Sequence, residues 1–537
     1  MVSMPTAEEI AALRQALADA LKTNESMSGE LRVLRTERDL LQEQLNRFKR
    51  RLFEARSEAA ASVQQKDMFF NEAEAEGAKA QPAAEETDNE AGDDQVDVPA
   101  HKRAKRGRKP LDPALPREVV RHELPEDERV CPHDGSVLNE IGVEVSEQLD
   151  IVPQQVRVIR HERVKYACPC CDGTIKLAAR PPQVIPKGLL SEAAQAWVIT
   201  AKYLDGLPLY RQAALLGRFG GTDWSRNTLA AGVVKVGLAV QPLVNLLRDE
   251  MLAAPIVYGD ETELQVLKEP GRKAQSKSYL WAQMTEAAGQ DGTGPPIRLF
   301  AYSPSRSTET AKTLYAGMRT GGVLMSDGYK PYEAIAQEHR LVHLGCWAHA
   351  RRGFHEALQA LPKDKRGPQQ LPARFIELIG RMYHVEAQAR RAGLEPAALQ
   401  RRRQEHSAPV LAEIEALLTT HLHAVLPSSL LGKALHYLAS QWPKLVRFID
   451  DGHYPLDNNA CENAIRPFVV GRRNWLFADT VAGANASANL YSLLQTCIAN
   501  GIDGYRYLKA LLIALPRAKT VEDFEALLPW RIALDPA

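Results

Sequence analysis

The 537-residue sequence predicts a multidomain α/β protein in which a mixed sheet with helices follows several smaller regions. Three observations lead to this prediction. A chain of this length holds roughly three to four domains at about 150 residues each. Short β-rich runs, the later ones alternating with helical patterns, lie between residues 256 and 345. Before residue 120, abrupt changes of composition mark the boundaries of separate regions.

Composition narrows the class of protein. Lys and Arg together number 67, as do Asp and Glu, so a polyanionic partner must be met by a local basic patch. No run of about 18 apolar residues and no N-terminal signal pattern is evident, so we expect a cytoplasmic protein that does not enter membranes. Seven cysteines, three of them within residues 168–171, favour metal binding over a disulfide framework.

Residues 8–54 predict a coiled coil, because apolar side chains recur every seven residues. Asn24 falls at a core position, where a polar side chain fixes register and partner number. A single amphipathic helix packed on its own domain is the alternative, but it has no use for such an asparagine. We therefore expect a homodimer or a higher oligomer. The two series of core positions are Ile10, Leu17, Asn24, Leu31, Arg38, Leu45 and Leu52, and Leu13, Ala20, Met27, Leu34, Leu41 and Phe48.

Residues 55–118 predict a disordered acidic linker followed by a basic arm. Residues 71–97 contain ten acidic residues and one lysine, a composition that opposes core formation. The sequence then changes to HKRAKRGRKP, in which glycine permits close approach to a narrow minor groove and proline stops a helix. A linker that neutralises its acidic neighbour is the alternative to a DNA contact. The candidate DNA-binding residues are Lys102, Arg103, Lys105, Arg106, Arg108 and Lys109.

Residues 119–185 predict a small zinc-ribbon-like domain. Cys131, His133 and Asp134 lie in one candidate knuckle, and Cys168 and Cys171 lie in the other. Two knuckles suit tetrahedral zinc, because each tight turn delivers two ligands from one side. Either the histidine or the aspartate would complete the set. A degenerate ribbon held by its own small core is the alternative.

Residues 186–250 predict a helical DNA-binding region of the helix-turn-helix type. The patterns LPLYRQAALLGRFG and SRNTLAAGVVKVGLAV are helical and are separated by a short break that contains glycine. Ser225 supplies an N-cap for the second helix. Arg226 and Asn227 then lie in the first turn of the recognition helix, where base edges are contacted. Helix pairs of this kind are also common without any role in DNA binding.

Residues 251–480 predict a ribonuclease-H-like catalytic domain. Three β-rich runs followed by strand–helix alternation give the order expected of such a sheet. Asp260 lies near the centre of the first run, where a buried carboxylate is costly unless a cation is present. Asp327 lies at the end of a later run, and Glu462 supplies a third acid. Together the three acids would hold two divalent ions, Mg²⁺ or Mn²⁺, for phosphodiester chemistry.

The segment around Glu462 predicts a helix that Asp457 or Asn458 would cap. Arg466 lies four residues after Glu462, on the same helical face, where it would meet phosphate. Arg472 and Arg473 are further candidate DNA-binding residues of this segment.

A helical insertion is expected at about residues 360–450, because Asp327 and Glu462 lie 135 positions apart. Just before it, Cys346 and His349 lie three apart at the start of a helix. They would support the metal site from outside its ligand shell or fill a core. A zinc pair is less favoured, since no matching pair is evident nearby. Residues 481–537 predict a C-terminal helical region.

Five strings carry a resemblance to a known family: YGDET, SDGYKPY, GCWAHARR, LDNNACENAIRPFVVGRRNWLF and LLPWRIA. They resemble, in this order, the motifs of the large transposase of insertion sequence 66 family elements, and the likeness covers about residues 10–535. The resemblance implies a catalytic triad of the DDE type at Asp260, Asp327 and Glu462. It implies the family's zinc pattern at Cys131, Asp134, Cys168 and Cys171, where the aspartate departs from the paired cysteines.

The resemblance implies a bacterial enzyme that binds the terminal inverted repeats of its element, hydrolyses a phosphodiester and transfers the freed 3′-hydroxyl to target DNA. Its partners would be double-stranded DNA at the ends and target, further copies of the chain, and small accessory proteins of the same element. Two other classes stay open. A DNA-binding regulator, or an inactive transposase-derived protein, would bind without cleavage. A ribonuclease-H-like repair or recombination nuclease would cleave without joining.

Overall fold

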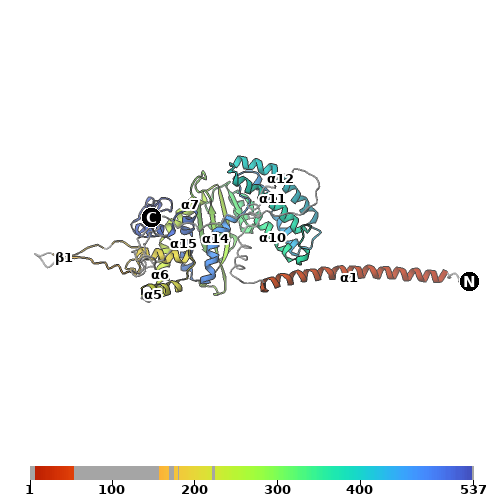
Figure 1. Ribbon diagram of the computed structural model, residues 1–537, viewed down its shortest axis with the longest axis horizontal. Coiled ribbons are helices and arrows are strands. Elements are labelled where there is room, and N and C mark those ends of the chain that lie inside the picture. The colour runs from red at the N-terminus through yellow and green to blue at the C-terminus, as the bar shows by residue number, and fades with distance from the viewer. Residues whose placement is uncertain (1–6, 54–155, 168–174, 180, 221–223, 535–537) are drawn as a thin grey trace, which may run out of the picture. The chain divides into compact units, whose positions relative to one another are not determined.

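The computed structural model describes residues 7–53, 156–167, 175–179, 181–220 and 224–534 (Figure 1). The predicted zinc ligands and the basic arm lie outside these ranges; they are Cys131, His133, Asp134, Cys168, Cys171 and residues 102–109. Two compact units are distinguished, and the site described below lies in the unit made of Met1–Gln81, His161–Leu215 and Asp223–Ala537.

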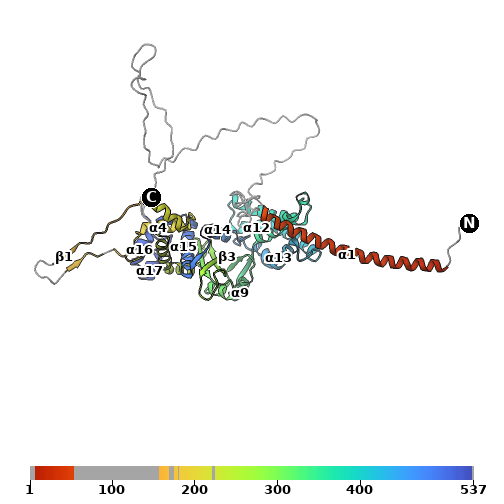
Figure 2. The same cartoon turned by 90° about the horizontal axis from the view of Figure 1, so that it is seen from below.

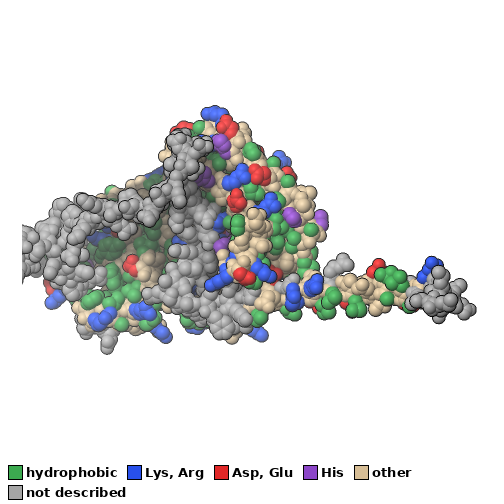
Figure 3. Space-filling model, turned by 45° about the vertical axis from the view of Figure 1, so that its right-hand side comes forward, with side chains coloured by type: hydrophobic (Ala, Val, Ile, Leu, Met, Phe, Trp, Pro, Cys, Tyr) green, Lys and Arg blue, Asp and Glu red, His purple; other side chains and the backbone are tan. Residues whose placement is uncertain are grey.

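The N-terminal segment forms one continuous helix, α1 (Ala7–Phe53). Leucines of the heptad series are exposed along it: Leu17, Leu31, Leu34 and Leu41 are 50–64 % accessible. Figure 3 shows hydrophobic side chains open to solvent on this helix. Leucine side chains stabilise a protein when they are removed from water. On a lone helix these leucines stay in water and contribute little stability. The pairing of this helix with another copy stays a prediction.

Helices α4 (Glu192–Tyr203), α5 (Leu209–Gly220), α6 (Arg226–Ala239) and α7 (Gln241–Leu252) follow the short antiparallel pair β1 (Lys165–Ala167) and β2 (Ile175–Leu177). The predicted cap of α6 is confirmed, since Ser225 Oγ accepts the backbone N–H groups of Asn227 and Thr228. In the described part of the chain, no single helix is long and apolar enough to cross a bilayer; α6 and α7 meet that test only as a pair bent by 46°.

The central sheet has the strand order β5-β4-β3-β6-β7. Its first three strands, β3 (Ile256–Lys268), β4 (Lys277–Thr285) and β5 (Ile297–Ser303), are antiparallel neighbours. Strands β6 (Val323–Ser326) and β7 (Val342–Gly345) continue the sheet in parallel with β3. The short strand β8 (Ala478–Thr480) pairs with the far end of β3. All five main strands lie within the β-rich runs of the sequence.

Helices cover both faces of this sheet (Figure 2). Helices α14 (Asn459–Trp475) and α15 (Val481–Ala499) pack on one face, where Phe300 of β5 contacts Tyr491 at 5.9 Å between ring centroids. Helices α8 (Thr308–Leu314) and α9 (Lys330–Glu338) cover the other face, where Trp281 of β4 meets Tyr332 edge-on at 6.1 Å. Phe300 pairs with Ala282, the residue after Trp281, so strand alternation points Phe300 and Trp281 to opposite faces of the sheet.

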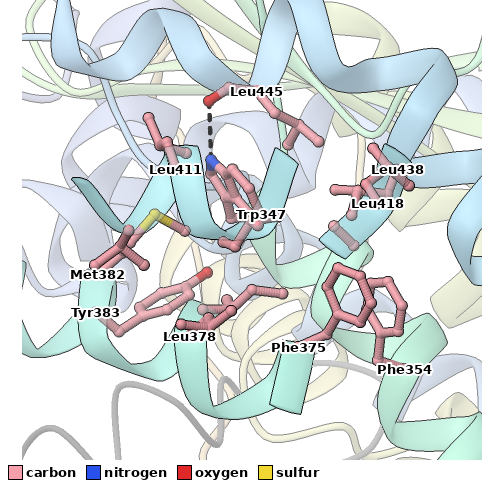
Figure 4. Close-up of a cluster of buried hydrophobic side chains, with 14 of the residues drawn as sticks. Trp347, Phe354, Phe375, Leu378, Met382, Tyr383, Leu411, Leu418, Leu438 and Leu445 are labelled. Atoms are coloured by element: carbon pink, nitrogen blue, oxygen red, sulfur yellow. Dashed lines mark hydrogen bonds between the residues drawn. The ribbon is translucent and has the colours of Figure 1, made fainter. Parts of the chain in front are cut away.

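Helices also fill the chain between β7 and α14: α10 (Trp347–Ala360), α11 (Leu371–Arg391), α12 (Pro396–His421) and α13 (Leu430–Leu445), with 3₁₀ turns at Lys363–Lys365 and Val446–Ile449. They share a core in which Phe354 stacks on Phe375 at 4.3 Å and Trp347 Nε1 donates to the Leu445 carbonyl at 2.9 Å (Figure 4). The chain then ends in α16 (Gly504–Ala514), a 3₁₀ turn (Leu515–Arg517) and α17 (Val521–Glu525).

Candidate active site: acids of strand β3 and helix α14

The parallel pairing of β3 with β6 places Asp260 and Asp327 at the same level of the sheet. Tyr258 pairs with Met325, and each aspartate lies two residues beyond its member of that pair. Asp260 is held by its own strand, since its Oδ1 accepts the Glu261 N–H at 2.8 Å. Asp327 directly follows β6, and its Oδ1 accepts the Tyr329 N–H at 3.0 Å. The two acids come from neighbouring strands, as the sequence predicts.

Alternation along β3 decides which acid faces which helix. A Cβ atom at Gly259 would collide with the hydroxyl group of Tyr315 and the ring of Tyr332, so position 259 faces α8 and α9. Asp260 therefore points to the opposite face, where α14 packs on β3 and β4. Glu261 returns to the first face, where its Oε2 accepts the Tyr332 hydroxyl at 3.0 Å.

The first turn of α14 brings Glu462 to the face of Asp260. Asn458 occupies the N-cap position but makes no side-chain cap; its Nδ2 donates to the Gly259 carbonyl of β3 at 3.1 Å. Asp457 Oδ1 accepts the Asn459 N–H at 3.0 Å instead. Both residues predicted as caps thus act at the start of α14. Asp457 accepts a backbone N–H of the helix, and Asn458 fastens the helix to β3.

The three predicted catalytic acids repel one another. Burial raises the pKa of Asp260 well above its ordinary value, and the charges of Asp327 and Glu462 raise it further. Burial also raises the pKa of Asp327, against a backbone hydrogen bond from Tyr329 and the charge of Arg306. Among the described residues, the ligand atoms of the three acids do not all lie within 4.8 Å of one another. A positive charge near these carboxylates would relieve their repulsion.

Helix α10 supplies the neighbours of Glu462, whose side chain is 4 % exposed. Arg352 Nη2 donates to Glu462 Oε2 at 3.2 Å, and His349 Nδ1 lies 3.4 Å from Oε1. Burial raises the pKa of Glu462 to about 7, although Arg352 opposes this change. Burial and the nearby Arg352 lower the pKa of His349 to about 3, so its imidazole is neutral. Cys346 Sγ lies within 4.8 Å of a ring nitrogen of His349 and of a carboxylate oxygen of Glu462. The structure thus brings both predicted outer residues, Cys346 and His349, to the third acid.

A fourth acid, Glu261, was not predicted from the sequence. Its side chain is 5 % exposed, and its Oε1 lies 3.6 Å from Arg306. Burial raises the pKa of Glu261 to about 7, and the charge of Asp327 adds to this effect. The sequence holds a signal for it, because Glu261 directly follows Asp260 in a strand whose preceding residues, 257–259, are buried on both faces.

The predicted cationic residues lie in several places. Arg466 is half-buried one turn after Glu462. At the end of α14, Arg472 Nη1 donates to the Glu263 carbonyl of β3, and burial lowers its pKa. Arg473 is exposed beside it. Arg226 and Asn227 are exposed in the first turn of α6.

Comparison with known proteins gives four matches along the chain. Residues 187–486 match the transposase IS66 family, and residues 128–172 match the zinc-finger binding domain of transposase IS66. Residues 40–120 match a segment described as transposase C of IS166 homeodomain, and residues 492–530 match the IS66 C-terminal element. The first of these covers the sheet, α14 and the three acids.

Two relatives come from Sinorhizobium fredii. The uncharacterised protein y4qI is 33 % identical over 443 residues, which are 81 % of this chain and 79 % of the relative. The uncharacterised protein y4jD is 32 % identical over 431 residues, which are 78 % of this chain and 82 % of the relative.

Proposed function

The chain belongs to the IS66 family of transposases, and from this membership we propose that it cleaves DNA at the ends of its element and joins the 3′-hydroxyl ends to target DNA. Asp260, Asp327 and Glu462 are the proposed catalytic acids. One observation carries this assignment: the acids come from β3, from the end of β6 and from α14, and the charge of Asp327 raises the pKa values of both buried partners, Asp260 and Glu462. Carboxyl groups whose pKa values are raised by burial and by neighbouring acids cluster at functional sites.

The strand order supports a ribonuclease-H-like domain. Three antiparallel strands are followed by two strands parallel to the first, with helices on both faces. In this arrangement β3 is central, and the carboxyl end of its neighbour β6 delivers a second acid beside the one on β3. Helices α10 to α13 then form the proposed insertion between the last main strand and the helix of Glu462.

The acid cluster fits two Mg²⁺ or Mn²⁺ ions. Such hard ions prefer carboxylate oxygens, and Glu462 Oε1 is a buried oxygen without a hydrogen-bond partner. When bound, a pair of these ions activates the attacking water or 3′-hydroxyl and stabilises the leaving oxygen.

The chain's own groups hold the acids in place for this role. Backbone N–H groups orient Asp260 and Asp327, and Arg352 orients Glu462 through Oε2, which leaves Oε1 available.

The remaining regions are proposed to bind DNA and further copies of the chain. The exposed leucine stripe of α1 suits a parallel partner helix. Residues 128–172 match a zinc-finger domain, which supports one structural zinc ion there. The basic arm, with Arg226, Asn227, Arg466, Arg472 and Arg473, is the proposed contact with double-stranded DNA. A cytoplasmic site of action and accessory proteins of the element remain part of this proposal.

Purified full-length protein, Mg²⁺ and DNA carrying the element's own ends test the function. Cleavage and joining should be lost in Asp260→Asn, Asp327→Asn and Glu462→Gln, while binding to the ends is retained. Glu263→Gln is the matched control, because Glu263 lies on β3 with a side chain that is 55 % exposed. Wild-type cleavage by any of the three variants would remove that acid from the triad. Cleavage without joining by the wild-type chain would instead favour a nuclease, and binding without cleavage would favour a regulator.

A further inference from the structure

A second cluster of metal-ligand atoms lies where α10 begins, against Glu462. Cys346 occupies the N-cap position of α10, and His349 follows in its first turn. The Cys346 sulfur, a ring nitrogen of His349 and a carboxylate oxygen of Glu462 all lie within 4.8 Å of one another. Cys346 is fully buried and Glu462 is 3 % exposed. Thiolate, imidazole and carboxylate together are the ligand types of zinc sites.

The spacing of His349 and Glu462 fits a shared cation better than a hydrogen bond. Their Nδ1 and Oε1 atoms are 3.4 Å apart, and neither atom has a hydrogen-bond partner although both are buried. A direct N–H···O bond would bring them to about 2.7–3.2 Å. A tetrahedral zinc ion with bonds of about 2.0–2.2 Å places its nitrogen and oxygen ligands about 3.4 Å apart.

Backbone N–H groups lie against the Cys346 sulfur, but burial, with the charges of Asp457 and Glu462, raises the pKa of its thiol, so the metal-free thiol is protonated. The Asn458 N–H donates to Sγ at 3.2 Å, and the His349 backbone N–H also points to it. The start of α10 adds the positive end of a helix dipole. A bound divalent ion would release the thiol proton to solvent. One thiolate and one carboxylate would then balance its two charges, and the neutral imidazole would complete the set.

We propose that Cys346, His349 and Glu462 bind one thiophilic divalent cation of the Zn²⁺ class, with the fourth position left open. This site differs from the proposed Mg²⁺ pair in its ligands, since only Glu462 is shared. Binding here does not depend on the proposed reaction. If both proposals hold, a zinc ion would engage Oε1 of Glu462 and compete with Mg²⁺ for the third acid.

The metal content of the full chain tests the site directly. Wild type, Cys346→Ser, His349→Gln and Cys497→Ser are loaded with Zn²⁺, freed of excess ion and measured for zinc per chain. Cys497 is the matched control, because it is equally buried but lies on α15 outside the cluster. All four proteins keep residues 128–172, so any zinc in that region cancels from the comparison. Cobalt(II) loading gives a second readout through the thiolate-to-cobalt absorption band.

Wild type and Cys497→Ser should each hold one more zinc ion per chain than Cys346→Ser and His349→Gln. The cobalt–thiolate absorption should fall by the same step. Equal zinc content in all four proteins would overturn the site, as would a loss confined to Cys346→Ser. If Cys346→Ser fails to fold by circular dichroism, His349→Gln against Cys497→Ser decides the question, since the His349 side chain is 21 % exposed and tolerates replacement better.

Discussion

Replacing Glu462 by glutamine is expected to stabilise the metal-free chain at neutral and higher pH. Burial raises the pKa of Glu462 from 4.5 to about 7 in the folded protein. The folded state therefore holds this proton more tightly than the unfolded state does. The stability that comes from the protonated carboxyl is fully present below about pH 4.5, and it is lost as the pH rises through about 7. Glutamine does not ionise, so the variant escapes this loss.

The size of the effect follows from the pKa change. At about 1.36 kcal/mol per pKa unit, a change from 4.5 to about 7 corresponds to about 3 kcal/mol of unfolding free energy. Because the Glu462 side chain is 4 % exposed, solvent screening takes little from this figure. Removing the Glu462 charge also relieves Asp260, whose pKa it raises, and that contribution has the same sign.

Urea unfolding of both proteins, followed by tryptophan fluorescence in EDTA from pH 4.5 to 8, measures the difference. The free energy of unfolding of Glu462→Gln minus that of wild type should rise by about 3 kcal/mol across this range. Asp479→Asn is the control, because the Asp479 side chain is 57 % exposed. If the free energy of unfolding changes with pH in the same way for Glu462→Gln and wild type, the ionised Glu462 carboxylate does not destabilise the folded chain.

Deleting residues 1–60 should weaken self-association, because the exposed leucines of α1 are lost; equal sedimentation of the two proteins would contradict this. Replacing the six basic residues of 102–109 by glutamine should flatten the salt dependence of DNA binding by about 0.9 in log–log slope for each lost phosphate contact, and an unchanged slope would exclude the arm. A fragment of residues 120–185 should carry about one zinc ion per chain by metal analysis, whereas a folded fragment without zinc would establish the degenerate ribbon. Arg403→Met should cost about 3–5 kcal/mol in thermal unfolding, because buried Arg403 pairs with Glu386 and binds three carbonyl oxygens; Arg381→Met, which breaks the exposed pair with Glu413, should cost under about 1 kcal/mol.

The sequence predicts the strands and their acids because alternation and turn residues are local signals. It places Asp260 within a strand and Asp327 at a strand end, and pairing of β3 with β6 brings these two acids to one level. It does not show what covers each face. Glu261 is buried on the opposite face of β3 by Tyr332, which reaches it from α9, 71 positions later, and this contact cannot be read from the sequence. The sequence also gives no ground for Arg352 as a partner of Glu462, since that contact joins residues 110 positions apart.

The same reasoning explains why Cys346 and His349 had no predicted metal partner. The residues near them in the sequence offer no matching pair, whereas the third ligand atom of the proposed site belongs to Glu462, on a helix that begins after the whole α10–α13 bundle. A ligand set assembled by tertiary packing leaves no spacing pattern for sequence analysis to find.

Helices α10 to α13 therefore do more than separate β7 from α14. Their core fixes the first turn of α10 through Trp347, whose ring nitrogen donates to Leu445 and whose backbone N–H donates to the Leu456 carbonyl just before α14. That turn carries Cys346 and His349, and the next carries Arg352. The bundle thus sets the position of every α10 group that contacts Glu462. Asn458 fastens the start of α14 to β3, so the turn that carries Glu462 is held by the sheet while its carboxylate contacts the bundle. Loosening either support should therefore change the environment of Glu462.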